Sequence, residues 1–189
     1  YLSELDRKIG DGDHGVTMNI GWMAVKEKLS TINPSDGFHK ICTQIASSFL
    51  SAVGASAGPL YATALMRGGG AVKDKNSLDA MSFSLFLNAA ANGIKERGKA
   101  EIGDKTMLDV WIPAADEMKK KASEGANLME ALECTVNTAE NAMNNTKNLL
   151  AKKGRSSKLG NRSIGHIDPG AASSFAIINS IFQTLKEMN

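Results

Sequence analysis

The chain has 189 residues, of which 42% are apolar, 22% charged and 5% aromatic, with 18 Gly and 4 Pro. This composition is typical of a compact globular domain and excludes a disordered or fibrous chain. Lys and Arg number 22 against 20 Asp and Glu, and the net charge of +2 creates no overall field that favours nucleic acid or an anionic membrane. We therefore expect a single domain over 1–189 and no nucleic-acid partner.

The longest apolar runs, such as 89–91 and 175–178, fall far short of the ~20 residues that cross a bilayer. The first six residues contain acids where a secretory signal carries cations and an apolar stretch. These features predict a cytoplasmic protein with no membrane partner. Cys42 and Cys134 are far apart in the sequence, which indicates neither a disulfide framework nor a zinc site, and both are expected in the core.

Apolar residues recur at helical spacing along most of the chain, and alternation with period two is nearly absent. Start and stop signals divide the chain into about eight helical segments, with boundary errors of ~3 residues. In chain order they are 1–9, 15–30, 36–53, 59–72, 77–98, 106–122, 127–152 and 169–188. Short links make neighbouring helices antiparallel, so we expect an all-α fold, either an up-and-down bundle or a closed ring.

Local signals refine the ends of these segments. Asp, Asn, Ser and Thr residues favour N-caps at Ser35, Ser77, Thr106, Asn127 and Asp168. Glycines favour left-handed C-caps at Gly54, Gly98 and Gly154. Pro113 is expected to kink the sixth segment or to mark a later start.

The stretch 6–15 contains three carboxylates, Asp6, Asp11 and Asp13. Asp6 ends the first helix, and the other two lie on a loop whose glycines allow sharp turns. Such close carboxylates repel one another unless a cation lies among them, and oxygen ligands without Cys indicate magnesium or calcium. An EF-hand is excluded because its twelfth position, Thr17, is not Glu, so magnesium fits better. The alternative is a solvated polar turn in which the acids act as caps.

The stretch 10–15 also matches the pattern GxGxxG, but a dinucleotide-binding fingerprint follows a strand and carries no acids against the phosphates. We therefore reject a Rossmann site.

Two other loops combine glycine with a helix start. In 54–59, Pro59 suits a first helical turn, and the exposed amides with the Ser56 hydroxyl favour anion binding; close helix packing is the alternative. The loop 165–172 has glycine spacing similar to a P-loop, but Ala171 and Ala172 replace the required Lys and Ser or Thr. Asp168 suits an N-cap there, and the amides of 170–172 remain candidates to face a ligand.

A basic run without acids lies between 152 and 162 and contains Lys152, Lys153, Arg155, Lys158 and Arg162. Such a run is usually a flexible solvated connector. Arg155, directly after Gly154, is the member best placed to reach a phosphate with its fork of donors.

Four motifs together resemble the nucleotide-binding subunits of dihydroxyacetone kinases, the DhaL family, over nearly the whole chain. In order they are Asp6-xxxx-Asp11-Gly12-Asp13-His14-Gly15, Gly54-Ala55-Ser56-Ala57-Gly58-Pro59, Gly103-Asp104-Lys105-Thr106-Met107 and Gly165-His166-Ile167-Asp168-Pro169-Gly170-Ala171. The resemblance implies an eight-helix antiparallel up-and-down barrel with the nucleotide bound across one rim.

The resemblance also implies roles for individual residues. Asp6, Asp11 and Asp13 are expected to bind two magnesium ions that bridge to the phosphates of ADP or ATP. The expected nucleotide contacts are His14, Gly15, Val16, Thr17, Ala55 and Ser56 at the phosphates, Gly98 and Met107 at the adenine, Arg155 as a further contact, and Asp168, Pro169 and Gly170 as a closing loop. Ala57 stands where many relatives have Ser or Gly, so one hydroxyl contact is expected to be absent. No residue is expected to carry phosphate covalently.

Family members are of two kinds. Some fuse this domain to a ketone-binding domain and exchange ATP; in others it is a separate subunit whose bound ADP is rephosphorylated by a phosphotransferase-system partner, DhaM, and passes phosphate to dihydroxyacetone on DhaK. At 189 residues the chain has no room for the ketone-binding domain, which favours the second kind. A nucleotide-dependent regulatory module that contacts a transcription regulator is the third possibility. A related domain of fatty acid kinase typically has Thr in place of His14, which argues against that assignment.

Overall fold

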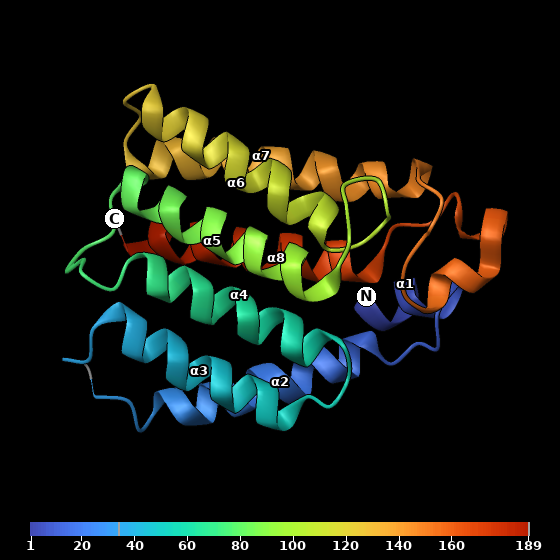
Figure 1. The fold of residues 1–189 in the computed structure, drawn as a ribbon, viewed down its shortest axis with the longest axis horizontal. Coiled ribbons are helices and arrows are strands. Elements are labelled where there is room, and N and C mark those ends of the chain that lie inside the picture. Colours follow the sequence, from blue (N-terminus) through green and yellow to red (C-terminus); the bar gives the residue numbers. More distant parts are fainter. Residues whose placement is uncertain (34, 189) are drawn as a thin grey trace.

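The computed structural model describes residues 1–33 and 35–188 and is built from helices (Figure 1). The α-helices are α1 (Leu2–Ile9), α2 (His14–Leu29), α3 (Phe38–Ala52), α4 (Ala57–Ala71), α5 (Ala80–Gly98), α6 (Leu108–Ser123), α7 (Leu128–Asn145) and α8 (Pro169–Met188). Two 3₁₀ segments, η1 (Thr146–Asn148) and η2 (Arg155–Ser163), lie between α7 and α8. No strand occurs in the described ranges, which confirms the all-α class.

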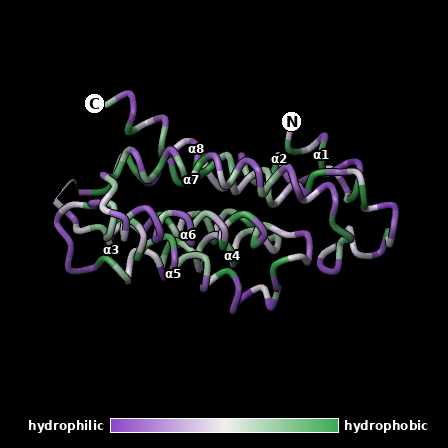
Figure 2. Tube along the Cα trace, turned by 90° about the horizontal axis from the view of Figure 1, so that it is seen from above, coloured by the Kyte–Doolittle hydropathy of each residue, from purple (hydrophilic) through white to green (hydrophobic). Residues whose placement is uncertain are grey.

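The helices lie in two layers. Consecutive helices contact each other from α1 to α8, and α8 also contacts α1 and α2. Figure 2 separates α3, α4, α5 and α6 in one layer from α1, α2, α7 and α8 in the other. The contacts between consecutive helices agree with the short links, from which we expected either an up-and-down bundle or a closed ring. Among the helices of 1–33 and 35–188, none is long and apolar enough to cross a membrane.

One connected apolar cluster draws on all eight helices. Phe49 of α3 is fully buried in it, and its ring meets Trp22 and Tyr61 edge to face, at centroid distances of 5.3 and 5.8 Å. Such aromatic pairs contribute about 0.5–1.5 kcal/mol each beyond the buried area. A Cβ at Gly21 would overlap the Phe49 ring, so α2 approaches α3 this closely only with glycine at that position.

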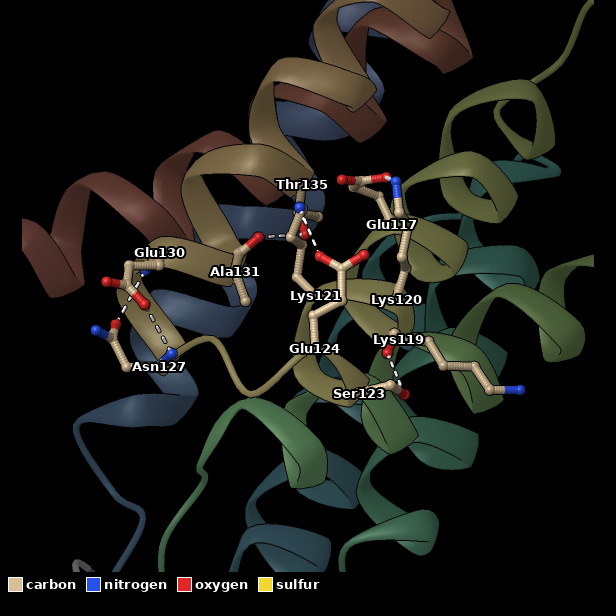
Figure 3. A network of polar contacts seen from close by, with 10 residues as sticks. All are labelled: Glu117, Lys119, Lys120, Lys121, Ser123, Glu124, Asn127, Glu130, Ala131 and Thr135. Atoms are coloured by element: carbon tan, nitrogen blue, oxygen red, sulfur yellow. Dashed lines mark hydrogen bonds and ion pairs between the residues drawn. The ribbon is translucent and has the colours of Figure 1, made fainter.

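The connection between α6 and α7 illustrates a helix start that the sequence predicts well (Figure 3). Asn127 accepts from the Glu130 N–H at 3.0 Å, and the Glu130 carboxylate accepts from the Asn127 N–H at 3.0 Å. This reciprocal pair is a capping box, and it confirms the N-cap predicted at Asn127. The N-caps predicted at Ser35, Ser77 and Thr106 are wrong by one or two residues, because α3, α5 and α6 begin after Gly37, Asp79 and Met107.

Glycine and proline signals were less reliable than the helical periodicity. The left-handed residue after α5 is Lys99 rather than Gly98, α3 ends before Val53 rather than at Gly54, and Gly154 follows no α-helix. The helix α6 begins at Leu108 and continues through Pro113.

The segment after α7 differs most from the prediction. The helix expected over 127–152 ends at Asn145, because Thr146 turns the chain: its hydroxyl donates to the Met143 carbonyl at 2.6 Å and accepts the Asp168 N–H at 3.0 Å. The basic run that follows is exposed at all five of its cations, as expected for a solvated connector, and η2 contains three of them. Of the two thiols, Cys42 is buried as expected and Cys134 is half-buried.

Candidate functional site

A cavity of about 770 Å³ brings segments from all four sequence motifs together. Its lining includes, of the residues singled out in the sequence, Asp6, Asp11, Asp13, His14, Thr17, Ala55, Ser56, Gly98, Met107, Arg155, Asp168, Pro169 and Gly170. Gly15 and Val16 do not line it: a Cβ at Gly15 would press on Ser3 of α1, and the Val16 side chain is 58% exposed. The wall also contains apolar residues that no motif indicated, Ile9, Leu60, Ile94 and Leu108.

The acid loop, residues 6–13, is shaped by two glycines. A Cβ at Gly10 would overlap the Asp6 carboxylate, so this carboxylate can lie over the loop only where position 10 has no side chain. Gly12 has a φ of +80°, a left-handed backbone that L side chains rarely adopt. As a result, Asp6, Asp11 and Asp13 each present an oxygen within 4.8 Å of the other two.

Neighbouring charges compensate these acids only in part. The buried Asp6 carboxylate accepts the His14 N–H at 3.1 Å, at the N-terminus of α2, and Asp11 forms an ion pair with Arg155. The cluster therefore keeps an excess of negative charge and offers only oxygen donors. That donor set suits a hard divalent cation such as Mg²⁺, which takes one or two carboxylates and completes its shell with water and phosphate.

His14 connects the acid loop to the start of α8. Its Nε2 lies 2.9 Å from Ser173 Oγ, and a Pro169 carbonyl also bonds the ring. Burial lowers the pKa of His14 and outweighs the opposite effect of Asp6 and Asp13. The imidazole is therefore neutral at pH 7 and contributes a hydrogen bond rather than a charge.

The start of α4 offers backbone donors to the cavity. Ser56 is the N-cap residue, and its hydroxyl makes no capping bond to the helix. A Cβ at Gly58 would overlap the Val53 carbonyl, so the turn can close this tightly only with glycine. Gly58 and Leu60 donate their N–H groups to the carbonyls of Ala55 and Ser56, and Pro59 has no N–H. The amides of Ser56 and Ala57 are therefore the donors at this helix start that suit a phosphate.

The start of α8 behaves differently from the expectation that its amides face a ligand. Asp168 caps the helix: its carboxylate accepts the Ala171 N–H at 2.8 Å and bonds the Gly170 amide, and its carbonyl accepts the Ala172 N–H. The predicted N-cap is thus confirmed, and the amides of 170–172 are used within the protein. Burial raises the pKa of Asp168 to about 7, despite these bonds and the nearby Lys105.

Two residues to which the sequence assigned no role fix the wall beside Met107. Lys105 has a φ of +61°, and its side chain is buried, with Nζ donating to the carbonyls of Thr146, Leu149 and His166. Asp109 accepts the N–H groups of Gly103 and Thr106 at 2.6 and 2.7 Å. Lys105 lies within the third motif and Asp109 two residues after it, but nothing local indicated which partners they bind.

Comparison with known proteins gives a family for these features. The model of the DAK2 domain matches residues 8–183. The chain is 41% identical to the PEP-dependent dihydroxyacetone kinase, ADP-binding subunit DhaL, of Escherichia coli, over 99% of this chain and 89% of that protein. It is 34% identical to the human triokinase/FMN cyclase, over 98% of this chain but only 32% of that protein.

Solved structures agree in fold. The dihydroxyacetone kinase of C. freundii superposes on 97% of this chain with a TM-score of 0.75 at 21% identity in its native form, and with a TM-score of 0.73 in complex with AMP-PNP and Mg²⁺. The present chain spans about a third of those longer chains. From the domain matched over residues 8–183 and the 41% identity to a relative that it covers to 89%, the chain belongs to the DAK2 domain family.

Proposed function

We propose that the chain is the nucleotide-binding subunit of a phosphoenolpyruvate-dependent dihydroxyacetone kinase and that it holds ADP or ATP with two magnesium ions. The observation that carries this proposal is the meeting of the acid loop, the α4 start and the Met107 wall in one cavity. A metal-binding acid cluster beside helix-start amides is an arrangement suited to a diphosphate. The printed function of the 41% identical relative supports the same conclusion.

In the proposed site, Asp6, Asp11 and Asp13 hold the magnesium ions, which supply charge neutralisation to the phosphates when bound. Arg155 pairs with Asp11, so its guanidinium lies beside the position to which the metal would draw the phosphates. The neutral His14, Thr17, Ala55 and Ser56 would line the phosphates, and Gly98 and Met107 the adenine. Gly15 and Val16 do not line the cavity, so any contact that they make with a phosphate would come from their backbone N–H groups at the start of α2.

Phosphoryl transfer depends mainly on alignment and charge neutralisation, and no residue in this cavity needs to carry phosphate covalently. We propose that bound ADP accepts phosphate from a phosphotransferase-system protein, DhaM, and that the resulting ATP passes it to dihydroxyacetone on DhaK. Asp168, Pro169 and Gly170 would close the site as a rigid turn, because the Asp168 cap already fixes their backbone.

A second candidate is an exchange kinase that binds ATP afresh for each turnover. The similarity to the triokinase/FMN cyclase favours it, since the name of that relative denotes a kinase and, unlike the name of the E. coli subunit, does not mention phosphoenolpyruvate.

The test is to denature the purified protein, identify the nucleotide released, and then offer the intact protein either the phosphorylated phosphotransferase partner or free ATP. Retained ADP that gains phosphate from the partner protein supports the relay, whereas weak retention with turnover on free ATP supports exchange. The variant Asp11→Asn should lose nucleotide and metal together, because it removes a negative ligand from their shared centre. A full complement of ADP and magnesium in that variant would refute the proposed site.

A further inference from the structure

A buried cluster of polar side chains adjoins the cavity and contains one residue or more from each of four helices. Its members are His14 of α2, Tyr61 of α4, Trp111 of α6, and Ser173 and Ser174 of α8. The Tyr61 hydroxyl lies 2.7 Å from Ser173 Oγ and 3.1 Å from Ser174 Oγ. The Trp111 indole donates to Ser174 Oγ at 3.0 Å, and His14 Nε2 lies 2.9 Å from Ser173 Oγ.

All members of the cluster except the half-buried His14 are enclosed in the protein, which makes their bonds important. Tyr61, Trp111, Ser173 and Ser174 are all buried, and burial raises the pKa of Tyr61 to about 12, so its hydroxyl stays protonated. A buried hydroxyl or indole N–H without a partner costs free energy, whereas a satisfied network holds its members in one arrangement. No buried side-chain nitrogen or oxygen among the described residues lacks a hydrogen-bond partner.

Each helix enters this cluster close to the point at which it lines the cavity. His14 lines the cavity itself, Tyr61 follows Pro59 by two residues, and Ser173 follows Gly170 by three. Trp111 follows Met107 by four residues, one helical turn. The cluster therefore joins the four motif-bearing segments just inside the wall that they form.

Ser173 Oγ connects three groups of this cluster. It lies 3.0 Å from the Gly170 carbonyl, 2.9 Å from His14 Nε2 and 2.7 Å from the Tyr61 hydroxyl. The tautomer of His14 sets which of Ser173 Oγ and His14 Nε2 is the donor, and the contact joins the two side chains in either direction. The backbone N–H of the same histidine donates to Asp6 at 3.1 Å. A continuous path thus leads from the core, through Ser173 and His14, to the buried carboxylate of the acid loop.

We propose that Ser173 and Tyr61 are positioning residues, which hold His14, and through its N–H the Asp6 carboxylate, in the geometry that binds a divalent metal. This inference rests on the function proposed above. Removing a group that fixes the orientation of a metal ligand through hydrogen bonds commonly lowers metal affinity by 10–100-fold. Because the cluster also reaches α4 and α6, the same bonds keep the nucleotide-binding segments in register with the metal loop.

The first test uses Ser173→Ala and Tyr61→Phe, each of which deletes one hydroxyl and keeps the remaining shape. We expect the Mg²⁺ concentration for half-maximal ADP binding, measured by calorimetry, to rise by about tenfold or more in each variant. The control is Thr135→Val, which also deletes a fully buried hydroxyl, bonded to the Ala131 carbonyl at 2.7 Å within α7. This control should leave the Mg²⁺ dependence unchanged.

A second test asks whether Ser173 acts through His14. We expect His14→Ala to weaken Mg²⁺-dependent ADP binding, and Ser173→Ala to add little to it in the double variant, because the bond between them is already absent. If the loss of ADP affinity in the double variant equals the product of the losses in the two single variants, the inference is wrong. It is also wrong if Ser173→Ala lowers thermal stability and leaves the Mg²⁺ dependence of ADP binding unchanged.

The two levels of proposal fail in different ways. If the unmodified protein binds no ADP with Mg²⁺, the proposed function fails. If it binds both, and the Ser173 and Tyr61 variants bind them as tightly, only the positioning role fails. The rescue variant Ser173→Thr, which restores the hydroxyl, should recover Mg²⁺ affinity relative to Ser173→Ala; equal losses in both would also count against the role.

Discussion

Lys105 joins its own loop to two other backbone segments beside the cavity, 146–149 and the loop at His166. Replacing it with methionine removes these bonds and fills most of the same space. Its Nζ donates to the Thr146 carbonyl at 2.7 Å, to that of His166 at 2.5 Å and to that of Leu149 at 3.3 Å. Bonds from charged donors contribute about 1.5–3 kcal/mol each, but only the two shorter ones are expected to reach that range. Burial lowers the pKa of Lys105, so part of this gain offsets the cost of enclosing the ammonium.

We therefore expect Lys105→Met to reduce the free energy of unfolding by about 3 kcal/mol. For a domain of this size, that loss corresponds to a fall in Tm of roughly 6–12 °C. Because the Lys105 loop also carries Met107, nucleotide affinity should fall in the same variant, and calorimetry with ADP would measure it.

The assay compares urea and thermal unfolding of Lys105→Met with those of Lys119→Met. Lys119 is exposed near the end of α6, so its replacement should change stability by less than about 0.5 kcal/mol. Equal unfolding midpoints for the two variants would show that the buried ammonium contributes no net stability, and the reasoning would then be wrong.

The remaining predictions concern the acid loop, the α8 cap and the α7 cap. Gly10→Ala should weaken Mg²⁺-dependent ADP binding by on the order of tenfold, because the new Cβ displaces the Asp6 carboxylate; calorimetry checks this, and wild-type affinity would contradict it. Arg155→Ala should speed the loss of ADP in dialysis and leave Tm nearly unchanged, since the Arg155 side chain is 66% exposed. An unchanged rate of ADP loss would show that Arg155 is only a surface residue. The native Asp168 keeps its proton up to about pH 7 while the unfolded chain releases it near pH 4, so the wild type should lose stability as pH rises through this window, by about 4 kcal/mol at most. Asp168→Asn should remove that loss of stability, which urea unfolding at several pH values would measure. If the unfolding free energies of the variant and the wild type change with pH in parallel, the pH dependence does not come from Asp168. Asn127→Ala should cost about 1 kcal/mol in urea unfolding through the capping box, and no cost would mean that water replaces the cap.

Helix positions were predictable where apolar periodicity controls them. The helical spacing of apolar residues predicted a helix over 36–53, and α3 spans Phe38–Ala52. The tail expected up to residue 152 was not predictable, because the turn at Thr146 depends on a bond from Asp168, which is 22 residues away in the sequence. Helix propensity describes local contacts and gives no information about such a partner.

The motifs anticipated most of the cavity lining, since glycine loops, acids and helix starts each have a local chemical signature. The hydrogen-bond partners of these groups in the fold were less predictable. The amides of 170–172 looked free in the sequence, but Asp168 occupies them in the structure. The sequence assigned Lys105 no role, and only its three distant carbonyl partners explain why it is buried.

Different kinds of contact stabilise the α6–α7 end of the molecule and the cavity end. This difference explains why the sequence predicts the contacts at the α6–α7 end and misses those at the cavity end. At the α6–α7 connection, local pairs such as Lys121 with Glu124 are exposed or half-exposed and lie within one helical turn, where sequence spacing predicts them (Figure 3). At the cavity end, Ser173 and Tyr61 are 112 residues apart, and serine in a helical pattern usually indicates a solvated face. Water-exposed pairs exchange partners readily, whereas a buried network in a low dielectric keeps one geometry. Phosphoryl transfer requires that geometry to be fixed, so the long-range buried bonds belong at the end that carries the acid loop.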